Sequence, residues 1–212
     1  MNALTIAYFT EGPTDQRFLK GIIDRTYQQL LLEASNEIEL FPPMHFGKSS
    51  ISEIRGIIQK TDGYMVLCIH CDADAGNDSN AYAERVEPIF QTIRDLGGCD
   101  NLVAIVPIHM TESWMLADKQ CFKEELDTNK KDSDLGIHRH PETIADPKKT
   151  IIEAIRIVDA DLPRKERHQI KIGHLYSPLS YKIRLTCLEQ LSSYSQFRSQ
   201  AMISLRKLGF LN

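Results

Sequence analysis

The strongest constraint on the fold is an apolar run at residues 64–69 that leads directly into two closely spaced aspartates, Asp72 and Asp74. Both alternating faces of this run are apolar, which is typical of a central strand in a parallel sheet with helices on both sides. A strand of this kind can be buried only if the rest of the chain provides further strands and apolar helices.

Three other segments favour β-structure, at residues 4–9, 38–46 and 102–108. The second contains two consecutive prolines, which break a strand or confine it to a sheet edge. Between these segments apolar residues recur at helical spacing, first at residues 18–31, and Thr14 is the expected N-cap of that helix. The alternation predicts an α/β fold, with a Rossmann-like sheet of about four mainly parallel strands sandwiched by helices.

The chain divides into three regions. Residues 1–126 form the predicted α/β domain, and residues 127–146 form a polar insertion that is a candidate for a mobile segment. Residues 147–212 form a basic, helical C-terminal extension packed on the same domain, whose first helix begins at Asp146-Pro147. Trp114 is expected to be a core anchor rather than a surface for base stacking.

Composition indicates an ordinary globular protein. Hydrophobic residues make up 42% and charged residues 25% of the 212 residues, and no apolar run reaches the roughly 18 residues of a membrane span. The first residues lack a basic leader followed by an apolar stretch, so we expect a cytoplasmic protein without a membrane segment. The five cysteines are expected to be reduced, and Cys68 and Cys71 should point to opposite faces of their strand.

Charge is distributed unevenly along the chain. Residues 163–212 contain nine Lys or Arg against two Glu, a net charge of +7, whereas the remainder carries −11. A basic segment can hold the backbone of a nucleic acid, and the candidates for this contact are Lys182, Arg184, Arg206 and Lys207. The alternative is that these side chains are ordinary solvated helix faces.

Acidic residues follow the predicted strands. Glu11, Asp72, Asp74 and Glu112 all lie just beyond a strand end, where parallel sheets bind ligands. If the strand continues through Asp72 and Asp74, they share a face, with Cα atoms ~6.6 Å apart, and can reach one cation. His70 would share that face as a ligand or as a hydrogen-bonded neighbour, and the second is the more common role.

These residues resemble a known domain. Residues 11–15 (Glu-Gly-Pro-Thr-Asp) after the first strand, with the later Asp-Ala-Asp of residues 72–74, are similar to the TOPRIM domain of topoisomerases, primases and OLD-family nucleases. Residues 111–118 and the ending around residues 176–178 and 195–197 resemble the small proteins of the DUF4276 type. The fold implied is a TOPRIM-like sheet.

The resemblance implies Mg²⁺-dependent (or Mn²⁺-dependent) phosphodiester chemistry. It gives Glu11, Asp72 and Asp74 catalytic roles, with Glu11 as metal ligand or general acid/base, and adds Asp15 and Glu112 as ligands of a second cation. Asp15 could instead stabilise the helix dipole. Lys182 or Arg184 are candidates to neutralise the transition state.

The function expected from the resemblance is a nuclease of DNA or RNA, acting as the effector of an anti-phage defence pair with an ABC/SMC-like ATPase. The chain contains no Gly-x-x-x-x-Gly-Lys-Ser/Thr motif, so an ATPase would be a separate protein. Assembly as a homo-oligomer is left open. Two alternatives are a non-catalytic TOPRIM assembly module and a small-molecule phosphohydrolase that uses the same acidic residues.

Overall fold

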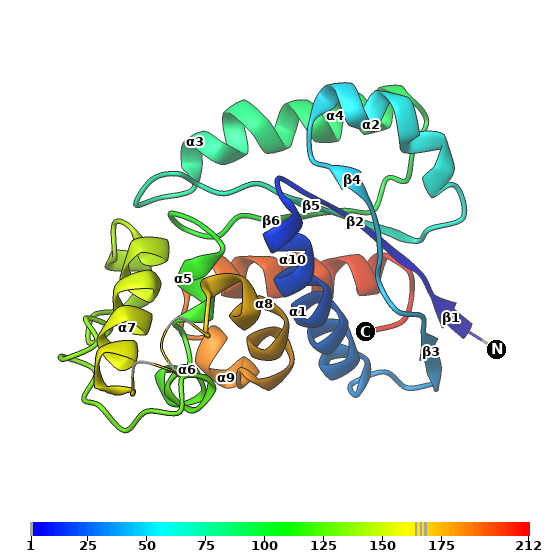
Figure 1. Cartoon of the computed structure of the whole chain (residues 1–212). Coiled ribbons are helices and arrows are strands. Elements are labelled where there is room, and N and C mark those ends of the chain that lie inside the picture. Colours follow the sequence, from blue (N-terminus) through cyan, green and yellow to red (C-terminus); the bar gives the residue numbers. More distant parts are fainter. Residues whose placement is uncertain (1, 164, 166, 168) are drawn as a thin grey trace.

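Four parallel strands lie at the centre of the computed structural model of the chain, in the order β4-β2-β5-β6 (Figure 1). The structure describes residues 2–163, 165, 167 and 169–212. The strands are β2 (Ile6–Thr10), β4 (Met44–Lys48), β5 (Val66–His70) and β6 (Leu102–Ile105). Each neighbouring pair is parallel, which confirms the predicted α/β class and its sheet of about four strands.

A second, two-stranded sheet lies beside the first. The β-prone segment 4–9 begins in this sheet, where β1 (Asn2–Leu4) pairs with β3 (Ile38–Leu40) before β2 starts. The two prolines divide segment 38–46 between β3 and β4, as expected from residues that have no N–H to donate.

Helices cover both faces of the central sheet (Figure 1). α1 (Pro13–Leu31) and α10 (Ser192–Lys207) pack on one face, and α2 (Ile51–Ile57) and α4 (Glu87–Asp95) pack on the other. The remaining helices and turns are η1 (Ile58–Thr61), α3 (Ser79–Ala81), the π-helical turn η2 (Tyr82–Val86), α5 (Glu112–Met115), α6 (Lys119–Glu125), η3 (Pro141–Thr143), α7 (Pro147–Asp161), α8 (Ile172–Lys182) and α9 (Leu185–Leu188).

The N-cap of α1 differs from the expectation. Gly12 is the cap residue, with extended φ and ψ of −143° and 168°, and Pro13 is the first helical residue. Proline favours this position because its fixed φ suits the helix and its missing N–H needs no partner there. Thr14 therefore lies inside the helix and is not its cap. The start of α7 is as predicted, with the Asp146 carboxylate accepting a hydrogen bond from the Lys149 amide.

The C-terminal extension shares the core of the α/β domain. Trp114 is fully buried, its Nε1 donates to Ser193 Oγ at 2.7 Å, and its ring meets that of Tyr194 edge-on at 5.3 Å. The predicted role of Trp114 as a core anchor is confirmed. The polar insertion is also fixed to this core, because Leu135 and Ile137 are buried in the same apolar cluster.

All five cysteines are free, and Cys68 and Cys71 lie in different apolar clusters on opposite faces of the sheet, as predicted. In the part of the chain that the structure describes, no helix is both long and apolar enough to cross a membrane.

An ion pair between a buried aspartate and an exposed arginine joins the α/β domain to the extension. Asp118 is 1% exposed, caps α6 by accepting from the Cys121 amide, and receives two hydrogen bonds of 2.8 Å from the Arg184 guanidinium. Burial alone would raise the pKa of Asp118, but the bonds from Arg184 and the cap lower it to about 2.

We predict that Asp118→Ala lowers the free energy of unfolding by more than the ~1 kcal/mol typical of a lost N-cap. The matched control is Asp146→Ala, which removes an exposed aspartate cap and should cost about that amount. Because the folded-state pKa of Asp118 is depressed, the stabilisation is present above pH 4 and is lost as the pH falls toward 2. Urea unfolding at several pH values measures both effects, and equal costs for the two variants at pH 7 would contradict the prediction.

Candidate metal centre

The polar residues converge where the strand order reverses. From β2 the chain crosses to β4 on one side and then to β5 on the other, so the carboxyl ends of β2 and β5 border the crevice in which parallel sheets bind ligands. Glu11 follows β2, and His70 ends β5. The pairing of Phe9 with Ile69 brings these two ends side by side.

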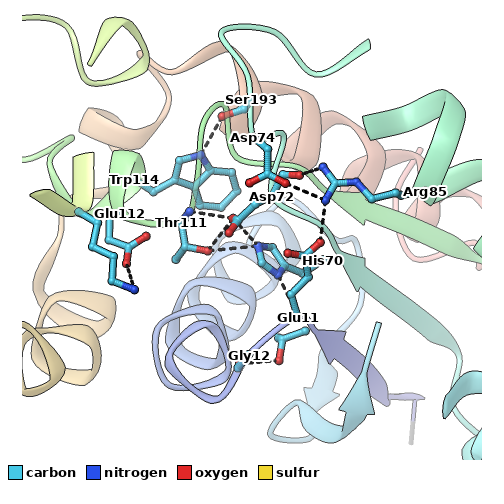
Figure 2. A network of polar contacts seen from close by, with 12 residues as sticks. Glu11, Gly12, His70, Asp72, Asp74, Arg85, Thr111, Glu112, Trp114 and Ser193 are labelled. Atoms are coloured by element: carbon cyan, nitrogen blue, oxygen red, sulfur yellow. Dashed lines mark hydrogen bonds and ion pairs between the residues drawn. The ribbon is translucent and has the colours of Figure 1, made fainter. Parts of the chain in front are cut away.

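His70, Asp72 and Thr111 form a buried hydrogen-bonded group (Figure 2). His70 Nε2 lies 3.1 Å from both Asp72 Oδ1 and Thr111 Oγ1, and the Thr111 amide donates to Asp72 Oδ1 at 2.9 Å. The Glu11 amide donates a hydrogen bond to His70 Nδ1 at 3.4 Å, so Nδ1 must carry a lone pair and no proton. The network therefore assigns the proton of the neutral imidazole to Nε2, which donates to Asp72.

Asp15 completes this group from the first turn of α1. One ligand atom from each of Asp15, His70 and Asp72 lies within 4.8 Å of the others. Asp15 is 8% exposed, and a Cβ atom on Gly12 would come within 3.2 Å of its Oδ2, so the glycine leaves room for this carboxylate. The arrangement favours Asp15 as a site residue over a role limited to the helix dipole.

Asp72 and Asp74 do not share a strand face, which corrects the expectation from their spacing. β5 ends at His70, and Asp74 has a left-handed backbone with φ of 54°. The Asp74 amide donates to the His109 carbonyl at 2.8 Å, and His109 itself has a φ of 62°. This turn directs Asp72 toward Thr111 and Asp74 toward Arg85 (Figure 2). Two residues with uncommon backbone angles thus lie at the candidate site.

Arg85 joins Glu11 to Asp74. Its Nη1 lies 3.0 Å from Glu11 Oε1 and 3.1 Å from Asp74 Oδ2, and its Nη2 donates to the main-chain oxygen of Asp72. Arg85 lies in the π-helical turn η2, a rare geometry often found at functional sites. The sequence analysis did not identify Arg85 because a single arginine on a predicted helix carries no motif.

Glu112 lies apart from the group that contains Asp15. Its Oε1 accepts a hydrogen bond from the Tyr176 hydroxyl and lies 3.7 Å from Lys148 Nζ. Tyr176 comes from α8, so the C-terminal extension contributes to the acidic region. The resemblance had marked residues 176–178, and this contact gives that segment a physical role.

Three carboxyl groups of the site, those of Glu11, Asp15 and Glu112, have raised pKa values and are difficult to ionise. Burial is the main cause that raises the pKa of Glu11, Asp15 and Glu112, and the neighbouring Asp72 raises each of them further. Burial lowers the pKa of His70, but its hydrogen bond to Asp72 and the nearby carboxylates outweigh that effect and raise it. A cation at the site would relieve this accumulation of negative charge.

Asp15 and Asp72 suit a divalent cation. Neither forms an ion pair with a Lys or Arg among the described residues, although their carboxylates lie at most 17% exposed and close together. Carboxylate oxygens are preferred ligands of Mg²⁺ and Mn²⁺. Because the His70 proton lies on Nε2, His70 positions Asp72 instead of offering a lone pair.

A family model described as "Domain of unknown function (DUF4276)" matches residues 10–190, most of the chain. The chain belongs to the DUF4276 family. This confirms one of the two resemblances found in the sequence, and the match includes every residue of the candidate site. No curated protein and no solved structure matches the chain, so the relation to TOPRIM domains and OLD-family nucleases stays a prediction.

The four basic residues predicted to bind nucleic acid lie away from the carboxylates of the DUF4276 chain. Lys182 is paired with Glu125 at 2.5 Å, and Arg184 is held by Asp118. Arg206 and Lys207 end α10, next to Ser204, whose carbonyl accepts a bond from Asn101 at the amino end of β6. Arg206 and Lys207 therefore lie near the amino ends of the strands, whereas the candidate site lies at their carboxyl ends. Arg164 and Glu166 of the basic segment lie outside the described residues.

We predict that Asp15→Asn and Asp72→Asn each weaken Mn²⁺ binding of the DUF4276 protein by about tenfold or more, because each removes a charged ligand from the buried group. Asp74→Asn is the control, since Asp74 is 67% exposed and is bonded to Arg85. The electron paramagnetic resonance signal of free Mn²⁺ in a titration measures all three. An equal loss of Mn²⁺ affinity in the Asp74 variant would contradict this prediction and support Asp72 and Asp74 as ligands of the same cation.

Proposed function

We propose that this protein is a divalent-cation-dependent phosphodiesterase that cleaves DNA or RNA. The observation that carries the proposal is the pairing of the buried carboxylate of Asp15 with the partly buried carboxylate of Asp72, which lie together at the crevice of a parallel sheet with no Lys or Arg partner among the described residues. Holding two such carboxylates together without a cation is unfavourable, and a cation there faces the position where this type of sheet binds its ligands.

The residues of the site would divide the work of hydrolysis. Asp15 and Asp72 would hold the cation, which would supply Lewis-acid activation for attack on a phosphodiester. His70 and Thr111 fix the Asp72 carboxylate by hydrogen bonds of 3.1 and 2.9 Å. Glu11, whose side chain is 34% exposed, can take up or release a proton at the mouth of the crevice.

A cationic groove next to the site favours a polymeric substrate. The groove has a volume of about 330 Å³, and its lining comprises Tyr8, Gln16, Arg17, Lys20, Ser177 and Tyr181. Gln16 is the chain neighbour of Asp15, and Ser177 is that of Tyr176, so the groove and the acidic region share the same turns of α1 and α8. Arg17 and Lys20 are exposed and form no hydrogen bond or ion pair with another described residue.

The groove also contains an aromatic surface. Tyr181 is 50% exposed, and exposed aromatic rings stack on the bases of single-stranded nucleic acids. Exposed cations for phosphates next to an aromatic ring for bases are the combination found in proteins that bind single strands. A small-molecule phosphohydrolase would not need such a path away from the acidic residues.

The cellular role proposed here rests on the resemblance alone. A cytoplasmic effector of an anti-phage defence pair would receive its ATP-dependent control from a separate ABC/SMC-like ATPase. Co-purification with the product of a neighbouring ATPase gene would support this partner, and failure to co-purify would contradict it. Either result is independent of the phosphodiesterase activity.

We predict that Mg²⁺ or Mn²⁺ supports cleavage of fluorescent single-stranded DNA or RNA, and that Asp72→Asn and Glu11→Gln each reduce the rate at least ~10²-fold. The matched control is Glu87→Gln, because Glu87 is an exposed acid paired with Arg94 away from the crevice. Hydrolysis of mononucleotides without cleavage of polymers would favour the phosphohydrolase, and metal-independent binding without any hydrolysis would favour the assembly module.

A second prediction concerns the groove. Replacing Arg17 and Lys20 by Gln should weaken binding of single-stranded DNA and reduce the slope of log affinity against log salt by ~0.7 for each phosphate that the protein no longer neutralises. The control removes the same charge near the amino ends of the strands, by replacing Arg206 and Lys207. Fluorescence anisotropy across a salt series measures both. A larger effect in the control would instead support the basic C-terminal segment as the surface that holds the nucleic acid.

A further inference from the structure

We infer that the guanidinium of Arg85 supplies the second positive charge of the site, so that the chain binds one divalent cation where two-metal phosphodiesterases bind two. The inference rests on the proposed function, because it concerns the same site. It departs from the expectation that Asp15 and Glu112 recruit a second cation.

The contacts of Arg85 carry the inference. One nitrogen, Nη1, lies within 3.1 Å of carboxylate oxygens from both Glu11 and Asp74, and Nη2 donates to the carbonyl of Asp72 (Figure 2). Glu11 and Asp74 lie outside the group of Asp15, His70 and Asp72, and so does Glu112, which contacts Tyr176 and Lys148 instead of Arg85. A second cation that used Glu11 and Asp74 would have to displace Arg85 from three acceptors.

The backbone explains how Arg85 reaches these acceptors. Pro88 has no N–H, so the carbonyl of Glu84 cannot receive the usual helical hydrogen bond, and the chain forms the π-helical turn Tyr82–Val86 just before α4. The wider turn changes the direction of the side chains within it. Arg85 points to the crevice, whereas Arg94 at the other end of α4 pairs with the exposed Glu87.

Arginine suits this role chemically. Its guanidinium keeps its charge at any physiological pH, and it can donate to several oxygens in fixed directions. Glu11 and Asp74 would repel each other without it, since both bond to the same Nη1. A fixed cation 3.0 Å from Glu11 is also placed to stabilise negative charge that develops on a phosphate bound beside it.

The experiment counts bound Mn²⁺ by electron paramagnetic resonance and isothermal titration calorimetry, without any activity assay. Wild type and Arg85→Lys, which keeps the charge, should bind one Mn²⁺ per chain. Arg85→Ala should bind two, because Glu11 and Asp74 become available as ligands. Arg94→Ala, in the adjoining helix α4, is the matched control and should bind one. Arg85→Gln, which retains hydrogen bonding without the charge, should also bind two and replaces the alanine variant if that variant does not fold.

The outcomes separate this inference from the proposed function. Two Mn²⁺ on the wild-type protein, or one Mn²⁺ on both neutral Arg85 variants, would overturn the role of Arg85 and leave the metal centre intact. No Mn²⁺ on the wild-type protein would overturn the metal centre and the inference together. Gain of a second Mn²⁺ only when the charge at residue 85 is removed is the supporting result.

Discussion

The parallel pairing of β2 with β5 is the interaction on which the rest of the site depends. It aligns Phe9 with Ile69, and as a result the chain leaves both strands at the same height. Glu11 and His70 then meet, with the Glu11 amide 3.4 Å from His70 Nδ1. If this register shifted by one residue, the side chains at the strand ends would point to the opposite face of the sheet.

The polar residues at this edge follow a consistent electrostatic pattern. The more accessible Glu11 and Asp74 share Arg85 as a cationic partner. The more buried Asp15 and Asp72 have hydrogen bonds but no Lys or Arg among the residues described by the structure. The fixed cation Arg85 lies beside the more accessible acids, and Asp15 and Asp72 have no such cation. This is the charge distribution expected of a site for one added cation.

The C-terminal extension belongs to the functional unit as well as to the core. Trp114, directly after the loop that carries Thr111, is packed against Tyr194 and bonded to Ser193 of α10. Tyr176 of α8 donates a hydrogen bond to the buried Glu112. Because these contacts fix both sides of the segment that holds Thr111, the α/β domain and the extension are expected to unfold together.

The amino-acid sequence alone predicts the four strands of the central sheet, the helices that cover them and the candidate acidic residues, but not the second sheet formed by β1 and β3. Apolar periodicity shows which faces are buried, and the position of Glu11, Asp72 and Glu112 after strands follows from the order of residues alone. Asp15 and Asp74 were also named, but their spacing in the chain could not show which acids share a ligand. The N-cap of α1 was predicted too late in the chain, because the preference of Pro13 for the first helical position is stronger than the preference of Thr14 for the cap.

The grouping of these acids depends on contacts between segments that are distant in the chain. Asp74 turns away from Asp72 because its left-handed backbone pairs with the loop of His109, a contact 35 residues distant along the chain. Arg85 reaches Glu11 across 74 residues, and Tyr176 reaches Glu112 across 64. Side chains that meet through separate elements leave no pattern in a single sequence, because periodicity records which face of its own element a residue occupies and not which residue lies opposite.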